Sequence, residues 1–74
     1  MTAIIRPFGH LKTFFNDQAA INVEAGRSVR ETLVMLKIQP EVIAGVFVND
    51  VPQTKEYILQ EEDDVRLFAV MGGG

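Results

Sequence analysis

The sequence predicts an α+β fold in which a mixed five-stranded sheet carries one main helix on one face. Five apolar segments separated by turn residues lie along the 74 residues, and a helical apolar period occurs only between the second and the third. The first and last segments are the most apolar, which is typical of the central strands of a sheet. At this length the chain is one small domain, predicted over residues 1–71.

The first two apolar segments are predicted to form a hairpin. Residues 1–8 are mostly apolar with a single charge at Arg6, and Pro7 ends or bulges this strand because proline cannot donate to a sheet ladder. A turn follows, the pair Asn16-Asp17 supplies a second polar turn, and residues 19–23 return as the second strand. The two strands are therefore expected to lie side by side.

Residues 28–40 contain the predicted helix. Ser28 and Glu31 form a capping box, in which each side chain accepts a hydrogen bond from the backbone N–H of the other residue. The helix is therefore expected to begin at Val29, and Pro40 to stop it. The apolar residues at helical spacing, which are predicted to face the sheet, are Val29, Leu33 and Leu36.

A second hairpin and a last strand follow the helix. Residues 44–48 are rich in β-branched and aromatic side chains, and the pair Asn49-Asp50 tolerates a positive φ. Residues 51–53 return as a short edge strand, where a proline is acceptable. Residues 65–71 form the last apolar strand, which gives the order strand, strand, helix, strand, strand, strand.

Composition removes most catalytic chemistry from the chain. There is no Cys and only one His, so we assign no catalytic residue, no metal ligand and no role to His10. Seven Lys and Arg against ten Asp and Glu give a formal charge of −3 without a basic cluster, so nucleic acid is not an expected partner. No apolar run approaches the length of a membrane span, and we expect no membrane partner and a cytoplasmic location.

The acidic run from Glu61 to Asp64 is interpreted as a solvated turn. Consecutive carboxylates are typical of such turns, whereas loops that hold hard cations alternate their carboxylates. A cation site is the alternative interpretation. The same run also offers concentrated negative charge, which would steer the domain toward a basic partner surface.

The C-terminal glycines are the most informative feature of the sequence. Met71 leads into Gly72, Gly73 and Gly74, and we expect residues 72–74 to be a flexible tail that carries the Gly74 carboxylate. Glycine permits close backbone approach, so such a tail can thread into a narrow channel of a partner protein. The alternative is a frayed end without function.

In this order and spacing, the motifs resemble those of the MoaD/ThiS family of ubiquitin-like sulfur carriers. The resemblance covers nearly the whole chain and implies the ubiquitin-like β-grasp fold. The motifs that carry it are Ile4-Ile5, Gly26-x-Ser28-Val29 with Leu33, Val46-Phe47-Val48-Asn49, Leu59-x-x-x-Asp63-x-Val65 and Gly73-Gly74.

The resemblance implies a protein cosubstrate that is not itself an enzyme and binds no cofactor. An adenylating enzyme of the ubiquitin-activating type would use ATP to activate the Gly74 carboxylate, and a persulfide donor would convert it to a thiocarboxylate. The sulfur would then pass to a thiazole synthase in thiamine biosynthesis, or to the large subunit of molybdopterin synthase. Two other functions stay open, which are a ubiquitin-like modifier conjugated through Gly74 and an interaction module with an inert tail.

Departures from the family pattern bear on the pathway. The pair Ala69-Val70 stands where molybdopterin carriers commonly have two prolines, and Gly72 makes the tail a triple glycine, which favours thiamine. The extended segment 6–12 favours molybdopterin instead. Glu62 stands where the family usually has the glycine of a Gly-Asp turn, so we expect strain there if the turn needs a positive φ.

Strand alternation predicts an apolar partner surface. If Val46 and Val48 point toward the helix, Phe47 points to the opposite face, and the same alternation puts Phe68 and Val70 there. The alternative is that these rings fold over the sheet edge as ordinary packing, and a shift of one residue in register would invert the assignment. The predicted partner interface comprises Phe47, Phe68, Val70 and Met71.

Overall fold

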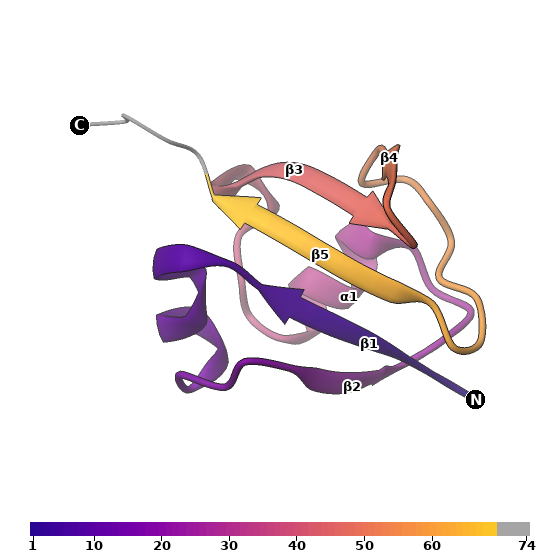
Figure 1. Ribbon diagram of the computed structural model, residues 1–74, viewed down its shortest axis with the longest axis horizontal. Helices are drawn as coiled ribbons and strands as arrows, with labels where there is room; N and C mark the ends of the chain where they lie inside the picture. Colours follow the sequence, from indigo (N-terminus) through magenta and orange to yellow (C-terminus); the bar gives the residue numbers. More distant parts are fainter. Residues whose placement is uncertain (70–74) are drawn as a thin grey trace.

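The computed structural model describes residues 1–69 and contains the predicted mixed five-stranded sheet (Figure 1). The strand order is β2-β1-β5-β3-β4, with β1 and β5 parallel and the other pairs antiparallel. The most apolar segments therefore lie side by side near the centre of the sheet, as predicted. The strands are β1 (Thr2–Pro7), β2 (Ile21–Glu24), β3 (Ile43–Val48), β4 (Val51–Gln53) and β5 (Asp64–Ala69).

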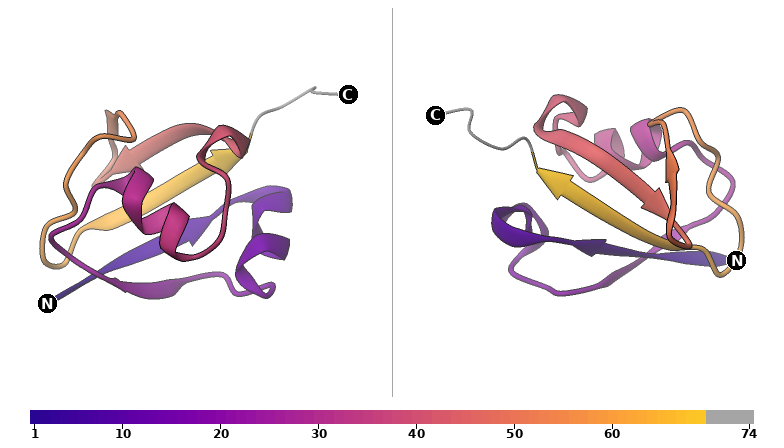
Figure 2. Two further views of the ribbon diagram at one scale, coloured as in Figure 1. Left: turned by 180° about the vertical axis from the view of Figure 1, so that it is seen from behind. Right: turned by 45° about the horizontal axis from the view of Figure 1, so that its top comes forward.

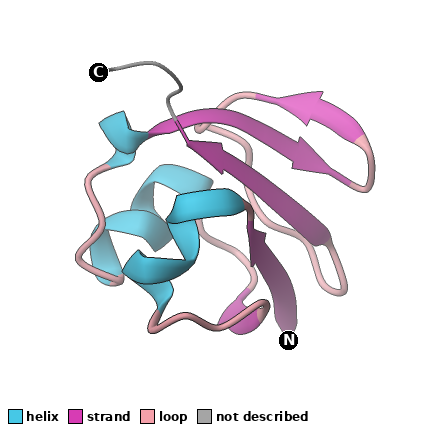
Figure 3. Cartoon of the chain, turned by 60° about the vertical axis from the view of Figure 1, so that its left-hand side comes forward, coloured by secondary structure: helices cyan, strands magenta, loops and turns pink. Residues whose placement is uncertain are grey.

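The helices gather on one face of the sheet (Figure 3), and the view from behind shows α1 in front of the strands (Figure 2). They are the α-helix α1 (Val29–Met35) and two 3-10 helices, η1 (Gly9–Phe15) and η2 (Pro40–Val42). The core lies between these helices and the sheet. Its largest fully buried side chains are Ile5, Leu11, Leu33, Ile43, Leu59, Leu67, Val29 and Val65.

The predicted capping box starts α1 at Val29. The Glu31 backbone N–H donates to Ser28 Oγ at 3.0 Å, and the Ser28 backbone N–H donates to Glu31 Oε1 at 3.1 Å. Two N–H groups that have no partner inside the helix are thereby satisfied, which stabilises a helix start by about 1 kcal/mol.

The predicted end of the helix was wrong in two respects. The helix stops at Met35, before Pro40, because Lys37 takes a left-handed conformation with a φ of 64°. The Ile38 N–H then donates to the Leu33 carbonyl at 2.9 Å, which is the bond that closes a Schellman turn. This turn buries Ile38 in the core and leaves Leu36, which was predicted to face the sheet, 37% exposed.

The connection between β1 and β2 is also more ordered than the predicted turn. Its first half forms η1, whose Leu11 and Phe15 side chains are buried against the sheet. Asn16 and Asp17 both have a positive φ, so the predicted turn pair is confirmed, although η1 separates it from β1. A 3-10 helix has three residues per turn, and no helix with this period was predicted from the sequence for this segment.

The prediction of a solvated acidic turn before β5 is correct for Glu61 and Glu62, which form an exposed turn, and wrong for Asp63, which is only 5% exposed. Its carboxylate accepts hydrogen bonds from Asn49 Nδ2 at 2.9 Å and from the Tyr57 hydroxyl at 2.8 Å. The Gln60 backbone N–H donates a third bond at 2.8 Å. Asp63 therefore ties the β3–β4 turn to the loop that enters β5.

The contact with Asp63 also sets the protonation of Tyr57. The hydrogen bond to the Asp63 carboxylate raises the pKa of the Tyr57 phenol above its ordinary value, and desolvation by burial raises it further. The phenol therefore keeps its proton and remains a donor at neutral pH.

We predict that Asp63→Asn lowers the free energy of unfolding by about 1–3 kcal/mol, because an amide in this position directs a donor at another donor. Tyr57→Phe is the control: it removes one of the three bonds, so we expect a loss of about 1 kcal/mol. Urea denaturation followed by circular dichroism measures both variants. Equal stability of Asp63→Asn and the unchanged protein would contradict the role of this network.

We predict that Glu62→Gly raises the free energy of unfolding by about 1 kcal/mol, because Glu62 has a φ of 67° and such a conformation is strained for residues other than glycine. Glu61→Gly is the matched control, since Glu61 has no positive φ and glycine there only adds entropy to the unfolded chain. The same denaturation experiment compares them. A destabilisation of both variants would show that the strain at Glu62 is negligible.

Candidate functional site

The predicted tail follows the central strand β5, whose last residue is Ala69. This end of β5 lies near η1 (Figure 1), and the Phe8 N–H donates to the Leu67 carbonyl at 3.0 Å. Val70, Met71 and the glycine tail at 72–74 lie outside the described residues, so their predicted roles and the domain boundary at residue 71 stay predictions.

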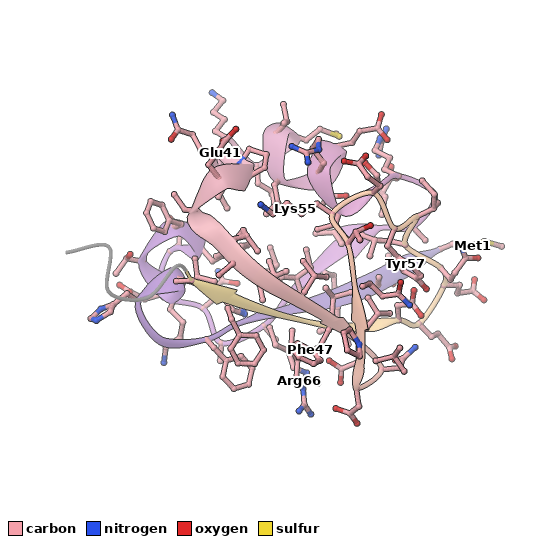
Figure 4. All side chains as sticks on the ribbon, turned by 90° about the horizontal axis from the view of Figure 1, so that it is seen from above. Met1, Glu41, Phe47, Lys55, Tyr57 and Arg66 are labelled. Atoms are coloured by element: carbon pink, nitrogen blue, oxygen red, sulfur yellow. The ribbon has the colours of Figure 1, made fainter. Side chains whose placement is uncertain are left out.

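The predicted alternation along β3 and β5 agrees with the burial of the side chains. Val46 and Val48 of β3 are buried on the helix side, as are the alternate residues of β5. Phe47 and Arg66 lie on the face opposite α1 (Figure 4). Phe68 is 36% exposed. Phe47 and Phe68 therefore lie on the outer face of the sheet, while their role as a partner interface stays a prediction.

Three phenylalanines form one cluster on this outer face. The rings of Phe8 and Phe68 are stacked, with centroids 4.8 Å apart, and the rings of Phe47 and Phe68 meet edge to face at 5.5 Å. Phe8 is 42% exposed. We call Phe8, Phe47 and Phe68 the aromatic patch. Neither the helices nor the core cover it, so it offers apolar area to a partner.

Phe8 was missed when the interface was predicted from the sequence. The signal was present, because Ala3, Ile5 and Pro7 are buried and the residues between them point to the outer face. What the sequence did not specify is the register of β1 against β5, in which Pro7 lies opposite Leu67. This register brings Phe8 level with Phe68.

Two ion pairs border the aromatic patch on the outer face. Arg6 Nε donates to both carboxylate oxygens of Asp64, at 3.1 and 3.2 Å, and Arg66 Nη1 lies 3.3 Å from Asp50 Oδ1. Arg6 and Arg66 are neighbours in the β1–β5 register. All four side chains are substantially exposed, so the pairs add little to stability. They can reorganise when a charged partner surface docks.

The described residues provide a binding surface and no assembled catalytic group. His10 is exposed on η1. Among residues 1–69 no group of three or more His, Asp or Glu side chains is placed to hold a metal ion. In the same part of the chain, no helix is long and apolar enough to cross a membrane.

Solved structures with the same fold cover nearly the whole chain. They include SAMP1 from Haloferax volcanii (16% identity, TM-score 0.70, 100% of both chains). A protein complex of subunits 1 and 2 of the molybdopterin-converting factor from Helicobacter pylori contains another (20% identity, TM-score 0.65, 100% of both chains). Urm1 from Trypanosoma brucei is a third (17% identity, TM-score 0.66, 99% of this chain and 95% of that one).

At these identities the structural similarity establishes the fold, which is the predicted ubiquitin-like β-grasp. No curated protein matches the chain by sequence. The model of the ThiS family matches residues 5–74, which is nearly the whole chain and includes the three glycines that follow Met71. This chain therefore belongs to the ThiS family and has the fold of its ubiquitin-like sulfur carriers and modifiers.

Proposed function

We propose that this chain is a sulfur carrier whose Gly74 carboxylate is adenylated and then converted to a thiocarboxylate. The observation that carries the proposal is that the family match extends through Gly74 and so includes the glycine tail. The chain acts as a cosubstrate in the cytoplasm and binds no cofactor of its own. The ATP is consumed by a partner of the ubiquitin-activating type.

The proposed chemistry needs only a terminal carboxylate from this chain. A Gly74 carboxylate oxygen attacks the α-phosphorus of ATP, which forms an acyl adenylate and releases pyrophosphate. The terminal sulfur of a persulfide on a partner then attacks the acyl carbon and displaces AMP. A second partner thiol then attacks the partner's own sulfur in the resulting acyl disulfide, which forms a disulfide in the partner and releases the thiocarboxylate on Gly74. The glycines suit these steps because they carry no side chain to block entry into a partner's active site.

The aromatic patch is the proposed docking surface for the activating enzyme. It is formed by β3, by β5 and by Phe8, which directly follows β1, on the face that the helices leave open, and Phe68 is one residue from the described end of β5. An enzyme bound there receives the tail as the chain leaves the sheet. Phe47, Phe68, Val70 and Met71 are the proposed contact residues, to which the geometry adds Phe8.

Within this proposal, the thiazole of thiamine is the favoured destination of the sulfur. Ala69-Val70 in place of two prolines and the third glycine, Gly72, support this choice. The alternative is the small subunit of molybdopterin synthase, which the extended segment containing η1 supports. The Helicobacter pylori complex is an example of a similar fold bound to a second subunit. The corresponding partners here are a thiazole synthase or a large molybdopterin-synthase subunit.

We predict that untagged protein purified from its own cells under non-reducing conditions contains a fraction heavier by about 16 mass units, because sulfur replaces one oxygen of a carboxylate. Intact-mass spectrometry detects the fraction, and fragmentation must assign the change to Gly74 rather than to an oxidised methionine. A variant lacking Gly73 and Gly74 should fold normally, since β5 ends at Ala69, but should not acquire the modification. An unmodified Gly74 joined to lysines of other proteins would instead indicate a ubiquitin-like modifier.

We predict that Phe68→Ala lowers the rate of ATP-dependent activation by the cognate adenylating enzyme by about 30-fold, because truncating an aromatic residue at an interface centre costs about 2 kcal/mol. Phe14→Ala is the control, since Phe14 is 54% exposed but lies on η1, outside the aromatic patch. Pyrophosphate release measures activation, and thermal unfolding shows that both variants are folded. Equal rates for the two variants would exclude the aromatic patch as the docking surface.

A further inference from the structure

A second apolar surface lies at the opposite margin of the sheet from β4, between the edge strand β2 and the helix α1. A groove of about 240 Å³ runs between these elements. Val23 of β2 and Thr32, Met35 and Leu36 at the end of α1 line it, with Arg27 beside them. In the left view of Figure 2, β2 passes below α1 at the margin of the sheet. The groove shares no residue with the aromatic patch.

The free edge of β2 presents unused backbone groups to this groove. The Ala25 N–H donates to the Met1 carbonyl at 3.1 Å, and Val23 lies opposite Ala3 in the same antiparallel ladder. Hydrogen-bonded positions alternate along such a ladder, so the N–H and C=O groups of Asn22 and Glu24 point away from β1. Over residues 1–69, no strand pairs with this edge. An extended peptide is the partner that satisfies both groups at once.

The helix side of the groove is more apolar than a solvated helix surface requires. Of the residues that line the groove, Met35 is 60% exposed and Leu36 is 37% exposed. The Schellman turn at Lys37 causes the exposure of Leu36, because it ends the helix at Met35 before Leu36 can face the core. An aliphatic side chain of an added strand would fill the space between Val23 and Met35.

The charged side chains at the groove indicate which residues of a bound peptide would lie next to its aliphatic side chain. Arg27 Nη1 lies 2.9 Å from Glu24 Oε1, and Arg30 Nε on the neighbouring turn lies 2.8 Å from Glu56 Oε2. In each pair the glutamate is the more exposed partner, and exposed pairs of this kind contribute little stability. Arg27, which lines the groove, is therefore available to exchange Glu24 for a carboxylate of an incoming chain, whereas Arg30 does not line the groove.

We propose that β2 and α1 form a second docking site, which binds an extended segment of a partner protein as an added strand on β2. An aliphatic side chain of that segment occupies the groove beside Met35, and an acidic residue next to it pairs with Arg27. The site lies across the sheet from the aromatic patch, so it can be occupied while an activating enzyme holds the tail. It does not depend on the sulfur-carrier function.

The test uses the full chain labelled with 15N and the synthetic peptide Glu-Val-Ile-Val-Asp, blocked at both ends. We expect saturable amide shifts at Asn22, Glu24 and Met35 in a titration followed by NMR. Replacing the central isoleucine of the peptide with proline should weaken binding by at least about tenfold, because proline cannot donate a hydrogen bond to the edge strand.

Two variants distinguish peptide binding at the groove from peptide binding at the other free edge of the sheet, which is β4. Met35→Glu should weaken binding of the peptide by at least about tenfold, whereas Val51→Glu should leave it within about twofold. Val51 is a fair control because it is 52% exposed and lies on the opposite edge strand, β4. The amide spectrum of each variant shows whether it is folded.

The remaining outcomes overturn the proposal. These are no saturable shift up to about 1 mM peptide, shifts confined to the aromatic patch, or equal affinity for Met35→Glu and the unchanged protein. Shifts at β2 on concentrating the chain alone would show that a second copy, and not a partner segment, fills the groove. Failure here is distinguishable from failure of the sulfur-carrier proposal, because Met35→Glu should keep the Gly74 modification and Phe68→Ala should keep peptide binding.

Discussion

The parallel pairing of β1 with β5 is the contact on which the rest of the structure depends. It joins segments some 60 positions apart in the chain, with Ile5 opposite Val65 and both side chains fully buried. In the same register the Arg6 side chain donates a hydrogen bond to Asp64, and the Phe8 ring stacks on the Phe68 ring. Core, ion pair and aromatic patch are therefore consequences of one alignment, and a shift of one residue would reverse the faces of the strand.

A chain this small has helices enough for only one face of its sheet. The helices α1, η1 and η2 cover one face of the sheet (Figure 3), whereas the outer face keeps three partly exposed phenylalanine rings. The exposed rings have a cost in water, and docking removes it. The division of the sheet into a core face and an exposed aromatic face therefore follows from the size of the domain, and it supports the proposal that partners dock on the outer face.

Local strain and local polarity are concentrated at the loop that enters β5. Glu62 adopts a positive φ, and the next residue, Asp63, is a buried carboxylate that holds three donors. The Glu62 N–H donates to the Thr2 carbonyl at 2.7 Å, which connects this loop to the start of β1. The strained turn is thus held by hydrogen bonds on both sides, and it lies where the paired strands β1 and β5 begin.

The sequence by itself determined the order of the elements, the capping box at Ser28, the Asn49-Asp50 turn and the outward direction of Phe47 and Phe68, because each depends on local spacing or on strand alternation. Only the tertiary structure decided the burial of Asp63, the entry of Ile38 rather than Leu36 into the core, and the neighbours of Phe68. The end of α1 at Met35 is itself local, since the Ile38 N–H donates to the Leu33 carbonyl five residues earlier, whereas burial depends on which segments far apart in the chain meet. Periodicity describes one segment at a time and carries no information about register between segments that are far apart in the chain.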